Sequence, residues 1–259
     1  MALARYKLVI AYDGTAYSGW QRQPDPVPTV QRVVERAFGQ IVNHPVIVHG
    51  SSRTDAGVHA LGQVAHADAD THIEPERLRR AINSRLPGDV DIRAVEILPN
   101  FDASRAVKKR YRYVIWRSRQ RPLFYRNYVY ECRFHTEISA MQAACEHFVG
   151  THDFIAFRGR LDERQTTVRT IFHCDIHRRG PFIIFSVEGS GFLYHMVRNM
   201  VGTVLAVGRG HMPPENIPTI IEKRDRALAG QCMPASGLCL QWIRFEAPDP
   251  AKTAGPLPD

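Results

Sequence analysis

The feature that most constrains the fold is the order of strand-like and helix-like segments over the first hundred residues. Short stretches of alternating or continuous apolar residues predict strands, and an apolar stripe with spacing i, i+3, i+4, i+7 predicts a helix. The predicted strands are 6–12, 46–48, 63–67 and 90–98, and the predicted helices are 30–41, with Thr29 as N-cap, and 75–86. This β-α-β-β-α-β order is that of a ferredoxin-like unit.

The second half of the chain repeats a mixed order, without any visible sequence repeat. The predicted strands are 108–116, 168–177, 182–187 and 237–245, and the predicted helices are 138–149, 191–207 and 214–223. We therefore predict an α+β fold in which the sheet of a second half joins that of the first. The predicted division is 1–103, 104–246 and a tail over 247–259, whose four prolines indicate disorder.

Charge narrows the class of partner. The 259 residues carry 34 Lys and Arg against 26 Asp and Glu, a formal charge of +8. A basic balance favours a polyanion, most commonly nucleic acid. No apolar run approaches the ~18 residues of a membrane span, and the first residues lack a signal-peptide core, so we expect a cytoplasmic protein.

The cysteines and glycines argue against a disulfide framework, a metal site and a nucleotide cofactor. The five cysteines are scattered without a Cys-x-x-Cys pair, and Cys132-x-x-His135 has no second paired element to complete a zinc site. Gly189-Ser190-Gly191 begins like a dinucleotide fingerprint, but Tyr194 replaces its third glycine. We expect no metal and no cofactor.

The loop Gly50–Ala60, Gly-Ser-Ser-Arg-Thr-Asp-Ala-Gly-Val-His-Ala, holds Asp55 close to Arg53 between two predicted strands. Serine, threonine and glycine terminate strands and form turns, and loops held by rigid strands often carry function. Alternatively, Asp55 caps its own turn and forms a surface pair with Arg53, worth at most about 1 kcal/mol. Spacing alone leaves both interpretations open.

Arg198 lies at the margin of an apolar predicted helix, where an unpaired guanidinium would be costly to bury. Asp55 is the natural partner, and the alternative is an arginine that extends to water. On the cationic strand 108–116, period two puts Tyr111 and Tyr113 on one face and Arg110 and Arg112 on the other.

The amino-acid sequences of these segments are more specific than the spacing of their charged and aromatic residues. The Gly50–Ala60 loop closely resembles the active-site loop of TruA-type tRNA pseudouridine(38–40) synthases, in which the aspartate matched by Asp55 is essential. Tyr111 matches the family's Lys/Arg-x-Tyr-x-Tyr strand, and Arg198 matches its Met-Val-Arg-x-x-x-Gly helix. Weaker matches extend from Tyr12 to Trp242. One departure is Phe101-Asp102-Ala103-Ser104-Arg105, where the family often reads Phe-His-Ala-Arg-Phe, so no role is assigned to Arg105.

The resemblance implies the pseudouridine synthase fold: two ferredoxin-like (RRM-like) α+β halves with joined antiparallel sheets and a central cleft. It implies a cofactor-free reaction in which uracil is cut from C1′ of ribose, turned, and rejoined through C5, at tRNA positions 38–40. Asp55 would act on the sugar or the base, Arg198 and Arg53 would hold Asp55 ionised, and Tyr111 would face a flipped uracil. The residues predicted to contact the anticodon stem-loop are Arg53, His59, Lys109, Arg110, Arg112, Arg158 and Arg160. A homodimer is expected.

Two other classes remain as alternatives. A non-catalytic RNA-binding protein on the same sheets would need paired sheet aromatics in an RNP pattern, which the sequence lacks. A glycosidase-like hydrolase usually needs two carboxylates, whereas the central loop offers only Asp55.

Overall fold

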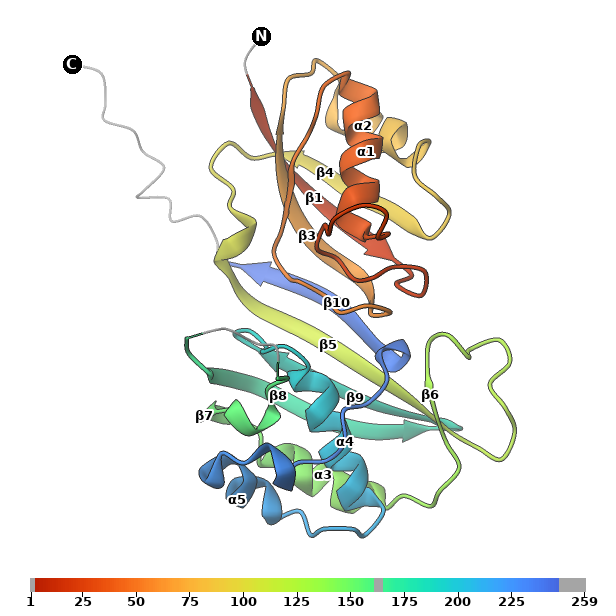
Figure 1. Ribbon diagram of the computed structural model, residues 1–259, viewed down its shortest axis with the longest axis vertical. Coiled ribbons are helices and arrows are strands. Elements are labelled where there is room, and N and C mark those ends of the chain that lie inside the picture. Colours follow the sequence, from red (N-terminus) through yellow and green to blue (C-terminus); the bar gives the residue numbers. More distant parts are fainter. Residues whose placement is uncertain (1–2, 161–164, 247–259) are drawn as a thin grey trace, which may run out of the picture.

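The strands of both halves form one continuous sheet (Figure 1). The computed structural model describes residues 3–160 and 165–246, so the predicted tail 247–259 lies outside the described residues. The strands are β1 Ala4–Tyr12, β2 Val48–Gly50, β3 His59–Ala69, β4 Val90–Ile97, β5 Ala106–Arg117, β6 Tyr130–Cys132, β7 Gly150–Asp153, β8 Val168–Arg179, β9 Phe182–Gly189 and β10 Leu238–Phe245. The helices are α1 Val30–Val42, α2 Pro75–Asn83, α3 Ile138–Glu146, α4 Met196–Gly208 and α5 Asn216–Lys223.

The strand order is β4-β1-β3-β10-β5-β9-β8-β7, with β2 on β3 and β6 on β5. In the first half, β4-β1-β3-β2 is the ferredoxin-like order, and β10-β5-β9-β8 repeats that order in the second half. Helices α1 and α3 follow the first strand of each unit, and α2 and α4 follow the third. The predicted fold class is therefore confirmed. The division at residues 103 and 104 stays a prediction.

The last strand, β10, joins the two halves. It pairs antiparallel with β5, and two of its residues pair parallel with the start of β3, where Leu240 lies beside Ala60. Strand β2 occupies the other end of the same β3 edge, through Val48 and Ala67. One edge of β3 is thus paired with β10 at one end and with β2 at the other. The Asp55 loop, which connects β2 to β3, lies where the two halves join.

The two faces of the sheet differ. One row of cross-strand neighbours is buried throughout: Tyr12, Ala60, Leu240, Tyr111, Val187 and Cys174. The core lies on this face, where Tyr6 of β1 packs edge-on against Phe38 of α1. Because side chains alternate along a strand, the next row, Arg112, Ser186 and Asp175, lies on the opposite face.

Several predicted boundaries were wrong. The helix predicted from residue 191 begins at Met196, because Gly191–His195 form a loop that ends in a left-handed residue, His195. The helix predicted to residue 86 ends at Asn83, whose side-chain amide bonds to the backbone of Ile92. Gly150–Asp153 form a short strand, β7, which pairs with β8 and is not among the predicted strands. None of the described helices is long and apolar enough to cross a membrane.

Candidate active site

The loop between β2 and β3 is held by hydrogen bonds along the residues that precede Asp55. Ser51 donates its backbone N–H to Val64 O at 2.8 Å, and Ser52 exchanges backbone hydrogen bonds with the buried Gln63 side chain. Thr54 Oγ1 lies 2.8 Å from the hydroxyl of Tyr12. Fixed geometry of this kind favours catalysis, because the loop need not reorganise when substrate binds.

Trp20 stabilises this loop through a backbone hydrogen bond and through close packing of its ring. Its backbone N–H donates to Thr54 O at 3.1 Å, and its ring, 1% exposed, packs so closely on Gly50 that a Cβ there would collide with the indole nitrogen. A ring this deeply buried plugs the core and supports the loop.

Asp55 and Arg198 meet across the junction of the two halves. Arg198 Nη1 donates to Asp55 Oδ2 at 3.0 Å, while Arg198 Nε donates to Met233 O at 2.6 Å. The Arg198 side chain is 15% exposed and the Asp55 side chain 18%, so this pair is far less screened by water than a surface ion pair. The structure confirms the predicted contact between Arg198 and Asp55. Within residues 3–160 and 165–246, Arg53 forms no ion pair with Asp55; its side chain is exposed and lines the cavity.

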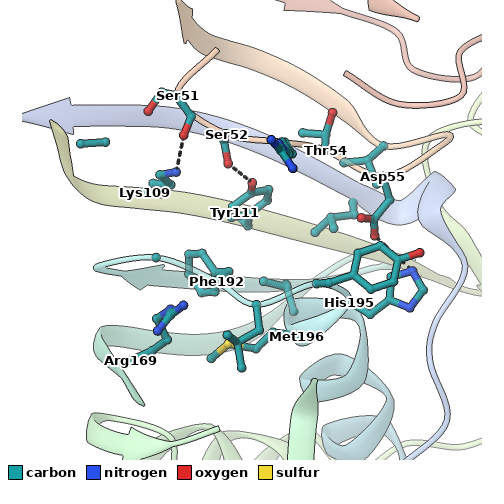
Figure 2. Close-up of a pocket in the computed structure, with 18 of the residues that line it drawn as sticks. Ser51, Ser52, Thr54, Asp55, Lys109, Tyr111, Arg169, Phe192, His195 and Met196 are labelled. Atoms are coloured by element: carbon teal, nitrogen blue, oxygen red, sulfur yellow. Dashed lines mark hydrogen bonds and ion pairs between the residues drawn. The ribbon is translucent and has the colours of Figure 1, made fainter. Parts of the chain in front are cut away.

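Tyr111 approaches the same loop from β5 (Figure 2). Its hydroxyl lies 3.0 Å from Ser52 Oγ, and its ring meets Phe192 edge-on with centroids 5.2 Å apart. Two positions earlier on the same face, Lys109 Nζ donates to Ser51 O at 2.7 Å. Strand β5 therefore contributes one aromatic ring and one cation to the Asp55 side of the sheet.

These residues line a cavity of about 780 Å³. Its walls come from the Asp55 loop, strand β5, and the loop 190–195 with the first turn of α4. Four cations line it, Arg53, Lys109, Arg169 and Arg198. Among the described lining residues, Asp55 is the one carboxylate. A positive cavity with a single acid suits an anionic substrate and one reacting carboxylate.

Other residues predicted to contact RNA lie elsewhere. Arg110 and Arg112 are on the opposite face of the sheet, where Arg110 Nη1 lies 3.3 Å from Glu188. His59 is buried; its Nδ1 accepts from Gly14 N at 3.1 Å, and its Nε2 donates to Asn127 O at 2.9 Å. This arrangement gives His59 a structural place between the halves. Arg158 is half-buried and Arg160 exposed, and neither lines the cavity.

Sequence reasoning missed His195, Phe192 and Arg169, which all line the cavity. His195 Nε2 lies 3.5 Å from Asp55 Oδ2. Burial lowers the pKa of His195, and Arg198 and Arg226 lower it further, against the opposing effect of Asp55. The sequence signal that could have identified His195 is its position three residues before Arg198 in the matched helix segment.

Comparisons with known proteins agree with this site. A family model described as tRNA pseudouridine synthase matches residues 8–104 and 144–246. The tRNA pseudouridine synthase A of Methylobacterium nodulans is 41% identical over 246 residues, covering 94% of this chain and 96% of the relative. That of Streptococcus thermophilus is 40% identical over 249 residues, covering 94% and 100%. The tRNA pseudouridine synthase A 2 of Clostridium perfringens is 43% identical over 241 residues, covering 92% and 98%. With the cavity between its two halves and these relatives along nearly its whole length, the chain belongs to the tRNA pseudouridine synthase family, and within it to the TruA type.

Proposed function

We propose that this protein isomerises uridine to pseudouridine in tRNA, at positions 38–40 of the anticodon arm, without a cofactor and with Asp55 as the essential residue. The observation that carries the proposal is the Asp55–Arg198 pair, at 3.0 Å, inside a cavity lined by four cations and Tyr111. The names of the relatives supply the substrate class, tRNA.

The reaction needs the N1–C1′ bond of uridine to break, the uracil to turn, and a C5–C1′ bond to form. The proton on C5 is then lost, and N1 gains one. The Asp55 carboxylate meets the sugar or base carbon, as carboxylates do in glycoside chemistry. Arg198 orients that carboxylate and compensates its charge, and Met233 O fixes the guanidinium in turn.

Tyr111 and the cavity cations bind the flipped nucleotide in this proposal. Uridine reaches such a cavity only when it is turned out of the helix stack, and an aromatic wall offsets the lost stacking. Arg53 and Lys109, which line the cavity, would contact phosphates beside the flipped nucleotide in this proposal. The single carboxylate disfavours the glycosidase alternative, which normally uses two. Cytoplasmic location and a homodimer stay predictions.

Tritium release from tRNA transcripts labelled at C5 of uridine tests the proposal, because only removal of the C5 proton frees the label. We expect release by the wild type, mapping to positions 38–40, and none by Asp55→Asn, with tRNA binding retained. Asp89→Asn is the matched control, because Asp89 bonds to Tyr17, away from the cavity. Wild-type protein that binds tRNA but releases no tritium would contradict the proposal, and a fully active Asp55→Asn variant would remove Asp55 from it.

A further inference from the structure

His195 occupies a strained position directly before α4. Its φ of 60° and ψ of 0° lie in the left-handed region, which only three non-glycine residues adopt among the described residues. This conformation costs roughly 1–2 kcal/mol in an L-residue other than glycine, so the surrounding structure must hold it. Strained residues of this kind cluster at functional sites, which motivates a closer look at the His195 side chain.

The imidazole packs against two neighbours. Its ring stacks on Tyr194 with centroids 3.8 Å apart. Gly159 lies close to both stacked rings, since an added Cβ there would come within 2.6 Å of Tyr194 Cδ1 and 3.2 Å of His195 Nδ1. Gly159 also donates its backbone N–H to Tyr194 O at 2.8 Å. These contacts hold the ring with Nε2 beside Asp55, as Figure 2 shows.

The two oxygens of Asp55 are not equivalent. Oδ2 accepts from Arg198 at 3.0 Å and lies 3.5 Å from His195 Nε2. In residues 3–160 and 165–246, no hydrogen bond or ion pair is seen at Oδ1. The carboxylate is therefore anchored through one oxygen, and the other remains available for the substrate.

We propose that His195 is a positioning residue, whose neutral imidazole donates from Nε2 to Asp55 Oδ2 when uridine fills the cavity, so that Oδ1 is the oxygen that meets the substrate. The distance of 3.5 Å is longer than a hydrogen bond, and such contacts commonly shorten when the substrate binds. The inference rests on the proposed function, because it concerns the carboxylate proposed to react.

The alternative role for His195, acceptor of the C5 proton, makes a different prediction. A proton acceptor must lose activity as pH falls through its pKa, whereas a donor to Oδ2 keeps its Nε2–H in either charge state. The charged groups around the ring are Asp55, Arg198 and Arg226. The pH dependence of kcat therefore separates positioning from proton acceptance.

The experiment uses two variants of His195. Glycine suits the left-handed backbone and removes the imidazole, and glutamine replaces the Nε2 donor with an amide that accepts no proton at neutral pH. We expect His195→Gly to lower kcat at least about tenfold, with unchanged tRNA Kd and Tm, and His195→Gln to recover to within about threefold of wild type. The acid limb of the kcat–pH profile should be the same in wild type and the glutamine variant.

Three results would overturn the proposal: wild-type kcat in the glycine variant, a glutamine variant that melts like wild type but is as slow as glycine, or an acid limb that disappears with glutamine. If the glutamine variant has a lower Tm than wild type, a rescue experiment with free imidazole added to the glycine variant takes its place. Restored turnover supports the proposal, and no restoration overturns it. Because all variants are compared with an active wild type, failure of the proposed function itself would appear first, as absent wild-type tritium release.

Discussion

Arg198 Nη1 and Asp55 Oδ2 lie 3.0 Å apart although 143 positions separate the two residues in the chain. The same guanidinium donates from Nε to Met233 O, so both ends of its planar fork are used. The arginine thus connects three segments, the Asp55 loop, α4 and the residues before β10.

Arg198→Lys tests this geometry. Lysine keeps the charge but cannot hold Met233 O and Asp55 with one planar group. We expect kcat to fall at least about tenfold, roughly 1.4 kcal/mol of transition-state stabilisation, with tRNA Kd nearly unchanged. Single-turnover tritium release measures kcat, and filter binding measures Kd. Arg209→Lys, at the far end of the same helix against Phe134, should be fully active; wild-type turnover in Arg198→Lys would show that a point charge suffices.

Tyr111→Phe tests the Tyr111 hydroxyl. The variant keeps the aromatic wall but loses the hydroxyl and its bond to Ser52 Oγ, a stability cost of about 1 kcal/mol. If the hydroxyl helps to remove the C5 proton, turnover should fall at least about tenfold while tRNA binding persists. Ser52→Ala removes the same hydrogen bond but keeps the hydroxyl, and we expect it to stay active. Unchanged turnover in Tyr111→Phe would discard a role in proton transfer.

The face of the sheet should decide which cations bind tRNA. Lys109 and Arg53 line the cavity, whereas Arg112 lies on the opposite face. We expect Lys109→Gln and Arg53→Gln each to weaken tRNA binding and to reduce the slope of log K against log salt by about 1. Arg112→Gln should leave both quantities unchanged. Binding titrations at several salt concentrations measure them, and an equal loss in all three variants would indicate that both faces contact RNA.

We expect the active site to depend on the close packing of α4 against the segment that contains Gln231 and Met233. An added Cβ at Gly202 would collide with the backbone oxygen of Gln231, two residues before the carbonyl that accepts from Arg198. We expect Gly202→Ala to lower the free energy of unfolding by about 1–3 kcal/mol, as overpacking does, and to lower kcat as well. Gly88→Ala, where a Cβ would meet nothing within 4 Å, is the control. Denaturant unfolding curves measure the stability change, and a neutral Gly202→Ala would show that this backbone segment can move without cost.

Local patterns in the sequence predicted most of the fold. The alternation of apolar residues in 6–12 and the apolar stripe in 30–41 follow from the periods of strands and helices. Each pattern can be recognised from the residues of that segment alone. The start of α4 was predicted too early, because His195 directly before the helix is left-handed and packs close to Gly159, a distant residue that no local pattern reports.

For the site, the sequence by itself determined the chemistry available: one acid in a turn-forming loop, one tyrosine on a cationic strand, and one arginine on an apolar helix that required an anionic partner. Period two also separated Tyr111 from Arg112, but it could not say which face holds the cavity. The tertiary structure decided that, and it brought His195 beside Asp55. Such contacts depend on how two halves meet along β3 and β10, and cross-strand register between distant segments is not encoded in the spacing of either one.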